Sequence, residues 1–405
     1  MTENLSLLLA ENYRRHESFR FETPSWTVDE RLVDAFTDRY LAAKETASSL
    51  TSKADDALRN ACLSAMNAIF DALDVQATQA PAQQFLVELR GEATRLLGEE
   101  LDWYAKARRH DFIDAAGDAF VDQLTALQSR RHFIACLPAS AVAEMNEIAQ
   151  AALGGFRANA AAGKLRREDL SINGGPIVAR IRRILNREFE KLGVLDAMSA
   201  YVGRKTRVVG LSLELSLPQA QWWRNTLEGL SRPPKTLYAH LDETISMPKS
   251  IVYLSDVGDD NGPTSCYPLA YEGMALNPLQ EIIGRVVGIV GSSTSSMLHE
   301  YYGKSYHQSV GSERFREHFM KLPEIMRFNS HLGWDVMPDS ALESRLAESE
   351  VRMTGPAGTF LVFDGARLLH RGGMVRSGER LALQVIISDL TLPQRVWRKL
   401  KRMVS

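Results

Sequence analysis

The sequence predicts an α+β protein in which a helical N-terminal part precedes a strand-rich part, and two observations support this prediction. In the first 130 residues, apolar side chains recur every three or four positions, which places them on one helix face: Leu58, Cys62, Met66 and Ile69. From about residue 206, short apolar and β-branched runs separated by turn residues replace that period. Separate helical and strand-rich stretches are typical of the α+β class.

The helical N-terminal part is expected to form a small domain at residues 1–132. After the run at 58–73, two further periodic runs cover 85–104 and 112–127, and a segment containing Pro81 separates the first two. Short connections between amphipathic helices favour antiparallel packing. The remainder, residues 133–405, is expected to form a second and larger domain.

The second domain is expected to begin with helices and to continue with strands. Helices are predicted at 141–159 and from Pro176 to residue 192, where the proline suits a first helical turn. Strands are predicted in four segments: 208–217, 250–254, 352–363 and 382–387. The turn sequence Asp259-Asp260-Asn261-Gly262 indicates a hairpin.

The composition excludes several classes of protein. The 405 residues include 48 basic and 50 acidic side chains, so a net charge of −2 provides no basic surplus for nucleic-acid binding. Three scattered cysteines form neither a disulfide framework nor a thiolate metal cluster and suit a reducing compartment: Cys62, Cys136 and Cys266. The chain has no apolar run of about 18 residues and no basic start of a signal peptide. We therefore expect a soluble, cytoplasmic protein.

One histidine pattern points to a metal site. Of the nine histidines, only His240 has a carboxylate two residues later, at Asp242. Residues i and i+2 of a strand point to the same face, so this imidazole and carboxylate can share an ion. About one such pair is expected by chance, so a third ligand is needed, and His370 lies just before the last predicted strand. Two histidines and one carboxylate form the facial triad of non-haem Fe(II) sites.

An arginine follows the third candidate ligand at a suggestive position. Arg380 lies ten residues after His370, at the start of an apolar strand. Its planar guanidinium can bind a carboxylate through two parallel hydrogen bonds. Such a cation next to an iron site suits the distal carboxylate of a cosubstrate such as 2-oxoglutarate.

These motifs, in this order, resemble those of the phytanoyl-CoA dioxygenase-like Fe(II)/2-oxoglutarate oxygenases. His240-x-Asp242 precedes a predicted strand at 251–255 and an Asn261-Gly262-Pro263-Thr264 hairpin similar to the NGxT hairpin of the family. The segment 358–365 then resembles the strand of the family that leads into the distal histidine, and His370 and Arg380 follow it. The resemblance covers about residues 205–390. This chain departs from the family pattern at Tyr267-Pro268, where the family continues into Pro-Gly-Ser-His, and in a long insertion at about 275–350.

The resemblance implies a double-stranded β-helix (jelly-roll, cupin-like) catalytic core at about 205–390 with an added N-terminal helical domain. It implies Fe(II) on His240, Asp242 and His370, with 2-oxoglutarate as cosubstrate and O2 as oxidant. Arg380 and the hydroxyl of Thr264 would bind the distal carboxylate of 2-oxoglutarate. Two tyrosines are expected to line the same pocket: Tyr238 and Tyr253.

The implied activity is a dioxygenase reaction that hydroxylates, or otherwise oxidises, an unactivated C–H bond of a small-molecule metabolite and releases succinate and CO2. Asp242 argues against halogenation, because a halide would need the coordination position of that carboxylate. Two alternatives stay open. A non-redox, metal-dependent jelly-roll isomerase or epimerase would need no equivalent of Arg380. A catalytically idle binding module would have the same barrel but would catalyse no reaction, and its helical domain would serve as an interaction surface.

Two segments contain features outside the oxygenase pattern. The expected insertion carries four histidines that we interpret as structural or exposed: His299, His307, His318 and His331. The C-terminal segment 395–403 places Trp397, Leu400 and Met403 on one face of a basic helix. Such a helix either docks onto the protein or makes weak contact with an anionic membrane surface. The sequence does not determine the oligomeric state.

Overall fold

The computed structural model describes residues 5–16, 26–48, 56–106, 118–202, 205–219, 235–236, 239–242, 248–268, 276–288, 313–328, 332–334 and 336–388. Within these ranges, the helices before the first strand are α1 (Leu5–Arg15), α2 (Glu30–Ser48), α3 (Asp56–Asp74), α4 (Ala80–Lys106) and α5 (Asp118–Arg130). Helices α3, α4 and α5 coincide with the three predicted periodic runs, and residues 112–117 of the third run lie outside the described part of the chain.

Further helices follow the first strand. The α-helices are α6 (Ala139–Ala161), α7 (Gly175–Lys191), α8 (Val194–Val202), α10 (Pro278–Gly288), α13 (Glu313–Lys321) and α14 (Ala341–Glu348). Three single 3-10 turns are η2 (Arg167–Asp169), η4 (Glu324–Met326) and η5 (Leu332–Trp334). As predicted, Pro176 lies in the first turn of α7. No helix in the described ranges is long and apolar enough to cross a bilayer.

The strands form two antiparallel sheets. The larger sheet has the order β1 (His132–Cys136), β7 (Thr359–Phe363), β4 (Lys249–Tyr253), β9 (Arg380–Ser388), β3 (Arg207–Ser216) and β2 (Ser171–Ile172). The smaller sheet has the order β6 (Val351–Arg352), β5 (Ser265–Cys266) and β8 (His370–Arg371). The single strand predicted at 352–363 is wrong in its extent, because a turn at 356–358 separates β6 from β7, and the glycines on either side of Pro356-Ala357 have positive φ values, 153° at Gly355 and 99° at Gly358.

The two faces of the larger sheet pack against different partners. On one face, Val252, Phe360 and Leu383 share a hydrophobic core with side chains of α6 and α7. On the other face, Tyr253 and Leu361 pack against residues of the smaller sheet, such as Cys266. This alternation follows the two-residue period of strands. Two antiparallel sheets that enclose a core are consistent with the predicted jelly-roll.

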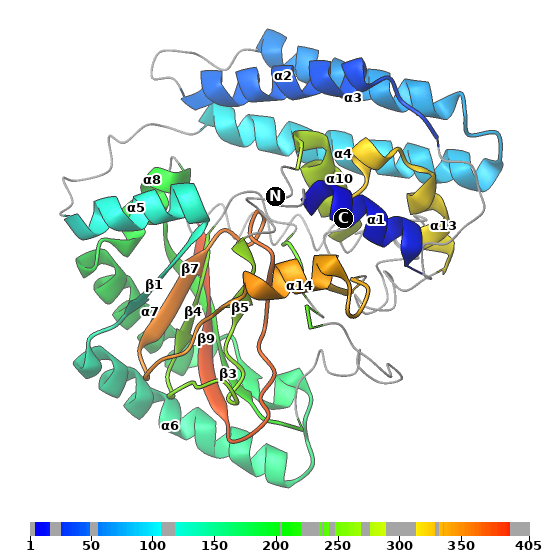
Figure 1. The fold of residues 1–405 in the computed structure, drawn as a ribbon. Coiled ribbons are helices and arrows are strands. Elements are labelled where there is room, and N and C mark those ends of the chain that lie inside the picture. Colours follow the sequence, from blue (N-terminus) through cyan, green and yellow to red (C-terminus); the bar gives the residue numbers. More distant parts are fainter. Residues whose placement is uncertain are drawn as a thin grey trace.

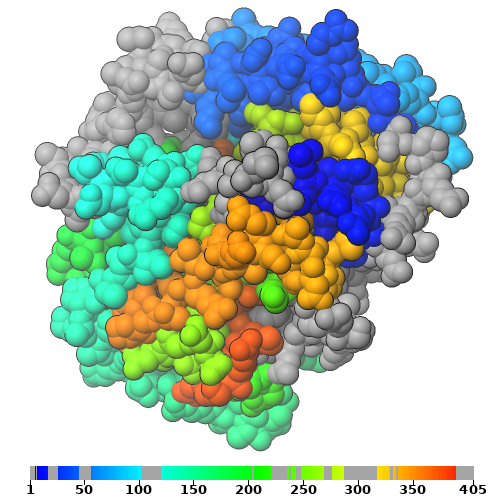
Figure 2. All heavy atoms as spheres, in the orientation of Figure 1, coloured from blue at the N-terminus to red at the C-terminus, as the bar shows by residue number. Residues whose placement is uncertain are grey.

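A second hydrophobic core joins segments that are distant in the sequence. Helices α1–α4, α10, α13 and α14 and the turns η4 and η5 share it, and we refer to these elements as the helical body. Figure 1 shows α2, α3 and α4 lying together above the sheet, with α10 against α4. On the face seen in Figure 2, α1 (dark blue) touches the orange segment that carries α14.

Much of the predicted insertion at 275–350 belongs to the helical body, because α10, α13, α14 and the turns η4 and η5 lie within it. Phe36 of α2, Leu97 of α4 and Ile283 of α10 are fully buried in its core. Helix α5 instead contributes Leu127 to the core beside the larger sheet. The division at residue 132 stays a prediction. Within α13, His318 is buried against the ring of Phe85, in keeping with the structural role expected for it.

Candidate metal centre

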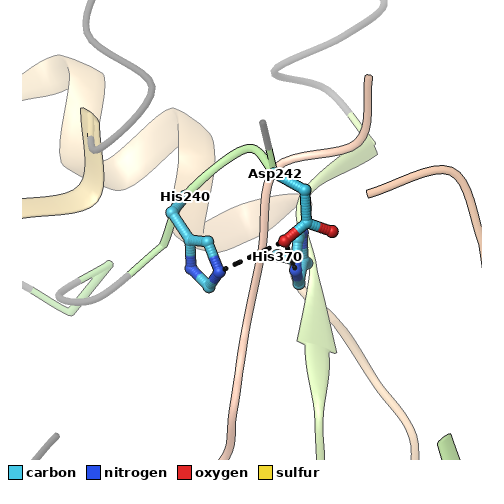
Figure 3. A group of neighbouring side chains, drawn as sticks. All are labelled: His240, Asp242 and His370. Carbon is cyan, nitrogen blue, oxygen red and sulfur yellow. Dashed lines mark ion pairs between the residues drawn. The ribbon is translucent and has the colours of Figure 1, made fainter. Parts of the chain in front are cut away.

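The three predicted metal ligands converge at one point. Nε2 of His240 lies 3.8 Å from Oδ1 of Asp242, and Nε2 of His370 lies 3.7 Å from the same oxygen. One donor atom from each residue lies within 4.8 Å of the other two. Figure 3 shows the two imidazole rings directed at the carboxylate. The structure therefore brings the three side chains together, although His370 is far from the other two in the sequence.

Backbone hydrogen bonds hold the three ligands in this arrangement. The amide of His240 donates to the carbonyl of His370 over 2.9 Å, and the amide of His370 returns the bond over 3.1 Å. The amide of Asp242 donates to the carbonyl of Gly365 over 2.8 Å. Between the first two ligands, Leu241 is buried in the core of the helical body. The segment thus presents polar side chains to the site and an apolar side chain to the helices.

The protonation of His370 suits metal binding. Its Nδ1 lies 2.9 Å from the carbonyl oxygen of Leu368, and a carbonyl can only accept, so Nδ1 carries the hydrogen and Nε2 presents its lone pair. Burial, reinforced by the charge of Lys249, holds the pKa of His370 well below its usual range. The imidazole is therefore neutral near pH 7, which is the form that binds a metal.

The carboxylate of Asp242 is also paired with a lysine that the sequence analysis did not select. Nζ of Lys249, the first residue of β4, lies 2.5 Å from Oδ2 of Asp242. Burial by itself would raise the pKa of Asp242, but Lys249 and the two imidazoles lower it below the usual range. Asp242 is therefore ionised. The register of β4 in the sheet brings the lysine to this position, and no local sequence pattern around Lys249 indicates it.

The donor set fits a divalent metal ion. Bonds to imidazole nitrogen and carboxylate oxygen are about 2.0–2.2 Å long, so neighbouring ligands of one ion lie about 3 to 3.5 Å apart. The donor separations of 3.7 and 3.8 Å are slightly larger, and small side-chain rotations close the difference. Two imidazoles and one carboxylate on one side leave coordination positions open, as in non-haem Fe(II) sites.

Arg380 faces the same cavity as the triad. Its Nη1 donates to the carbonyl of Gly262, and its Nη2 donates to Oγ of Ser216 over 3.2 Å. Its Nε is buried and has no hydrogen-bond partner among the described residues. A guanidinium has five N–H donors and these two bonds use two of them, so Arg380 retains donors for a carboxylate.

The other residues predicted to bind the cosubstrate have different positions. Thr264 lines the cavity, and its predicted contact with the cosubstrate stays a prediction. Tyr253 is fully buried and is not among the residues that line the cavity. Its hydroxyl oxygen accepts a hydrogen bond from the backbone amide of Thr264 over 2.8 Å, so Tyr253 fixes the position of the threonine. Tyr238 lies outside the described residues, as do His299, His307, His331 and the C-terminal segment 395–403.

The cavity extends from the triad towards the edge of the larger sheet. Its volume is about 480 Å³, within the usual range of small-molecule sites. Besides the triad, Arg380 and Thr264, it is lined by apolar residues such as Ile251 and Phe363. A polar cluster lies on the side of β3. There, Glu214 accepts hydrogen bonds from Arg167 over 2.8 Å and from Gln384 over 2.9 Å.

Comparisons with known proteins identify similar solved structures. No family model and no curated protein matches the sequence. AviO1 from Streptomyces viridochromogenes Tue57 is 14% identical over 68% of this chain and 97% of its own, with a TM-score of 0.35. EctD from S. alaskensis, solved with 2-oxoglutarate and 5-hydroxyectoine, is 16% identical over 70% and 82%, with a TM-score of 0.37. The epimerase SnoN, solved with Fe3+, alpha ketoglutarate and nogalamycin RO, is 13% identical over 67% and 84%, with a TM-score of 0.33. At these values the function has to be argued from the site.

Proposed function

We propose that this protein is an Fe(II)- and 2-oxoglutarate-dependent oxygenase that oxidises a C–H bond of a small-molecule substrate. The observation that supports the proposal most directly is the presence of a two-histidine, one-carboxylate ligand set and a partly unsatisfied arginine in one cavity. His240, Asp242 and His370 would hold the ion. When bound, Fe(II) supplies the redox chemistry in which O2 and 2-oxoglutarate are consumed and succinate and CO2 are released.

The protein's own residues would orient the cosubstrate. 2-Oxoglutarate carries two carboxylates, and four lysine and arginine side chains line the cavity: Arg167, Lys249, Arg371 and Arg380. The first three are paired with Glu214, Asp242 and Glu350, respectively, whereas Arg380 makes no ion pair among the described residues. The distal carboxylate would therefore lie against Arg380 and Thr264. A carboxylate held by charge-assisted bonds in a largely apolar cavity is fixed in direction, which positions the keto end towards the triad.

The substrate would occupy the remaining part of the cavity, on the side of β3. The polar cluster of Arg167, Glu214 and Gln384 offers charged and amide groups that can bind polar groups of a small molecule. The apolar side chains nearer the triad would exclude water from the reacting carbon. A cavity that is polar on the side of β3 and apolar near the triad favours a metabolite with one polar end.

Anaerobic spectroscopy tests this proposal. Addition of Fe(II) and 2-oxoglutarate to the full chain is expected to give the weak visible charge-transfer band of the chelated complex. His370→Ala and Arg380→Ala should lose the band, whereas Arg376→Ala should retain it. Arg376 is a matched control because it is an exposed arginine close to Arg380. If the wild type gives no band, the oxygenase assignment fails and a non-redox metal site is favoured.

Succinate release separates an oxygenase from an idle binding module. In air, the wild type with Fe(II) and 2-oxoglutarate should release succinate, and more so with a substrate from a metabolite panel. His240→Ala should release none, because one of the three ligands is missing. A charge-transfer band without succinate from any tested metabolite would instead support the idle module.

A further inference from the structure

A buried acid of the helical body is connected to the metal centre. Glu100 of α4 is 0% exposed, and it accepts hydrogen bonds from Tyr40 Oη over 2.7 Å, from Arg285 Nη1 over 2.9 Å and from Arg367 Nη2 over 3.1 Å. Tyr40 and Arg285 belong to the helical body, at α2 and α10. Arg367 belongs to the turn at 364–368, which links β7 to β8.

Arg367 and Asp364 determine the shape of that turn. Nη1 of Arg367 donates to Oδ2 of Asp364 over 3.3 Å. Oδ1 of Asp364 accepts the amide of Ala366 over 3.1 Å, and its backbone carbonyl accepts the amide of Leu368 over 2.8 Å. An aspartate that hydrogen-bonds to its own following backbone is a common stabiliser of tight turns. Arg367 thus links this turn directly to Glu100.

The same turn orients two of the three metal ligands. Its Gly365 carbonyl accepts the amide of Asp242, and its Leu368 carbonyl accepts Nδ1 of His370. A Cβ atom at Gly365 would lie 1.9 Å from Oδ2 of Asp242, so the turn is packed directly on that carboxylate. A displacement of the turn would therefore move Asp242 and remove the hydrogen bond that fixes His370.

The position of the turn depends on charge compensation at Glu100. The side chains of Arg285 and Arg367 are only 1% and 6% exposed. Two acids compensate the charge of Arg285: Glu100, 2.9 Å from its Nη1, and Glu281, 3.5 Å from its Nη2. Removing one member of a buried ion cluster leaves uncompensated charge, which the structure relieves by rearrangement. Because Arg367 contacts both Glu100 and the turn, a shift of the Arg367 side chain would displace the turn.

We propose that Glu100 is a positioning residue through which the helical body holds the metal ligands in their binding geometry. The inference rests on the proposed function, since it assumes that the triad binds a metal. It assigns a role to the N-terminal helices, which contain none of the predicted ligands. Residues that orient metal ligands typically contribute about 10- to 100-fold to metal affinity.

Metal affinity measured on matched variants tests the role of Glu100. Co(II), which has a visible d–d spectrum, is titrated into the wild type, Glu100→Gln and Glu99→Gln. Glu99 is the neighbouring acid, 57% exposed and paired with Arg95 at the surface. We expect Glu100→Gln to bind Co(II) about 10- to 100-fold more weakly with an altered d–d spectrum, and Glu99→Gln to match the wild type. A folded Glu100→Gln protein with wild-type affinity and spectrum would overturn the inference.

Two further variants keep the inference falsifiable if Glu100→Gln does not fold. Glu100→Asp keeps the negative charge in the cluster but shortens the side chain and so lengthens its contacts with the arginines, including Arg367. We therefore expect a folded protein with weakened Co(II) binding. Wild-type binding by folded Glu100→Asp would overturn the inference. His370→Ala separates this inference from the proposed function. If His370→Ala leaves Co(II) binding unchanged, the triad is not the metal site and the proposed function fails; if only the Glu100 variants leave it unchanged, this inference alone fails.

Discussion

The ammonium group of Lys249 lies 2.5 Å from Oδ2 of Asp242, while Oδ1 of the same carboxylate faces the two imidazoles. The lysine therefore occupies one carboxylate oxygen and leaves the other for a metal ion. Because the two oxygens have separate partners, this carboxylate is prepared to bind an ion through one oxygen. An open coordination position is thereby preserved for other ligands.

Replacement of Lys249 by methionine should weaken metal binding. The substitution keeps the length of the side chain and removes its charge, so Oδ2 loses its partner and the carboxylate can rotate. We expect metal affinity to fall by about 10-fold or more, as measured by Co(II) titration. Lys249→Arg, which keeps the charge, should lose less. Equal affinity in the wild type and Lys249→Met would show that the ion pair does not orient Asp242.

A methyl group at Gly365 should disrupt the metal centre. Its Cβ would lie 1.9 Å from Oδ2 of Asp242, so Gly365→Ala must displace the carboxylate or the turn. We expect loss of Co(II) binding and of succinate release. Gly154→Ala is the control, because Gly154 lies in α6 with nothing within 4 Å of an added Cβ. That change should stabilise the protein by about 0.5–1 kcal/mol in chemical denaturation.

Conservative replacement of Arg380 should affect the cosubstrate more than the metal. Arg380→Lys keeps a positive charge but loses the fork that binds a carboxylate through two bonds. The loss of one charge-assisted hydrogen bond, about 1.5–3 kcal/mol, should raise the KM for 2-oxoglutarate by roughly 10- to 100-fold. Succinate release at varied 2-oxoglutarate concentration measures this change, and Co(II) affinity should stay constant. An unchanged KM would place the distal carboxylate elsewhere.

Acid should destabilise the protein through Glu100. Burial alone would raise the pKa of this carboxyl, but Arg285 and Arg367 outweigh burial and lower it from 4.5 to about 2. Because the pKa is lower in the folded state, the stabilisation is complete above pH 4.5 and is lost as the pH falls towards 2. Between pH 6 and pH 3 the loss is roughly 2 kcal/mol.

Chemical denaturation at several pH values measures this contribution. The wild type should lose more stability than Glu100→Gln between pH 6 and pH 3, because glutamine does not titrate. Glu99→Gln should follow the wild type over the same range. Parallel pH profiles for the wild type and Glu100→Gln would mean that the buried carboxylate does not contribute to acid unfolding.

The sequence was most informative where a function depends on a short motif. His240-x-Asp242 can be recognised because two residues of an extended segment face the same way, and Arg380 because it has a fixed spacing from His370. Strand prediction was less accurate between β6 and β7, where a turn at 356–358 flanked by Gly355 and Gly358 interrupts the predicted strand. Local patterns do not show whether a glycine continues a strand or turns the chain.

The sequence by itself determined which residue types can hold a metal and a carboxylate, and where the chain changes from helices to strands. Only the tertiary structure brought Lys249 to Asp242, Tyr253 behind Thr264, and Glu100 to Arg367. Glu100 and Arg367 are separated by 267 positions, and nothing local to either residue marks it as part of the site. Their pairing follows from burial: once packing removes a charge from water, an opposite charge must be brought to it, whatever its place in the chain.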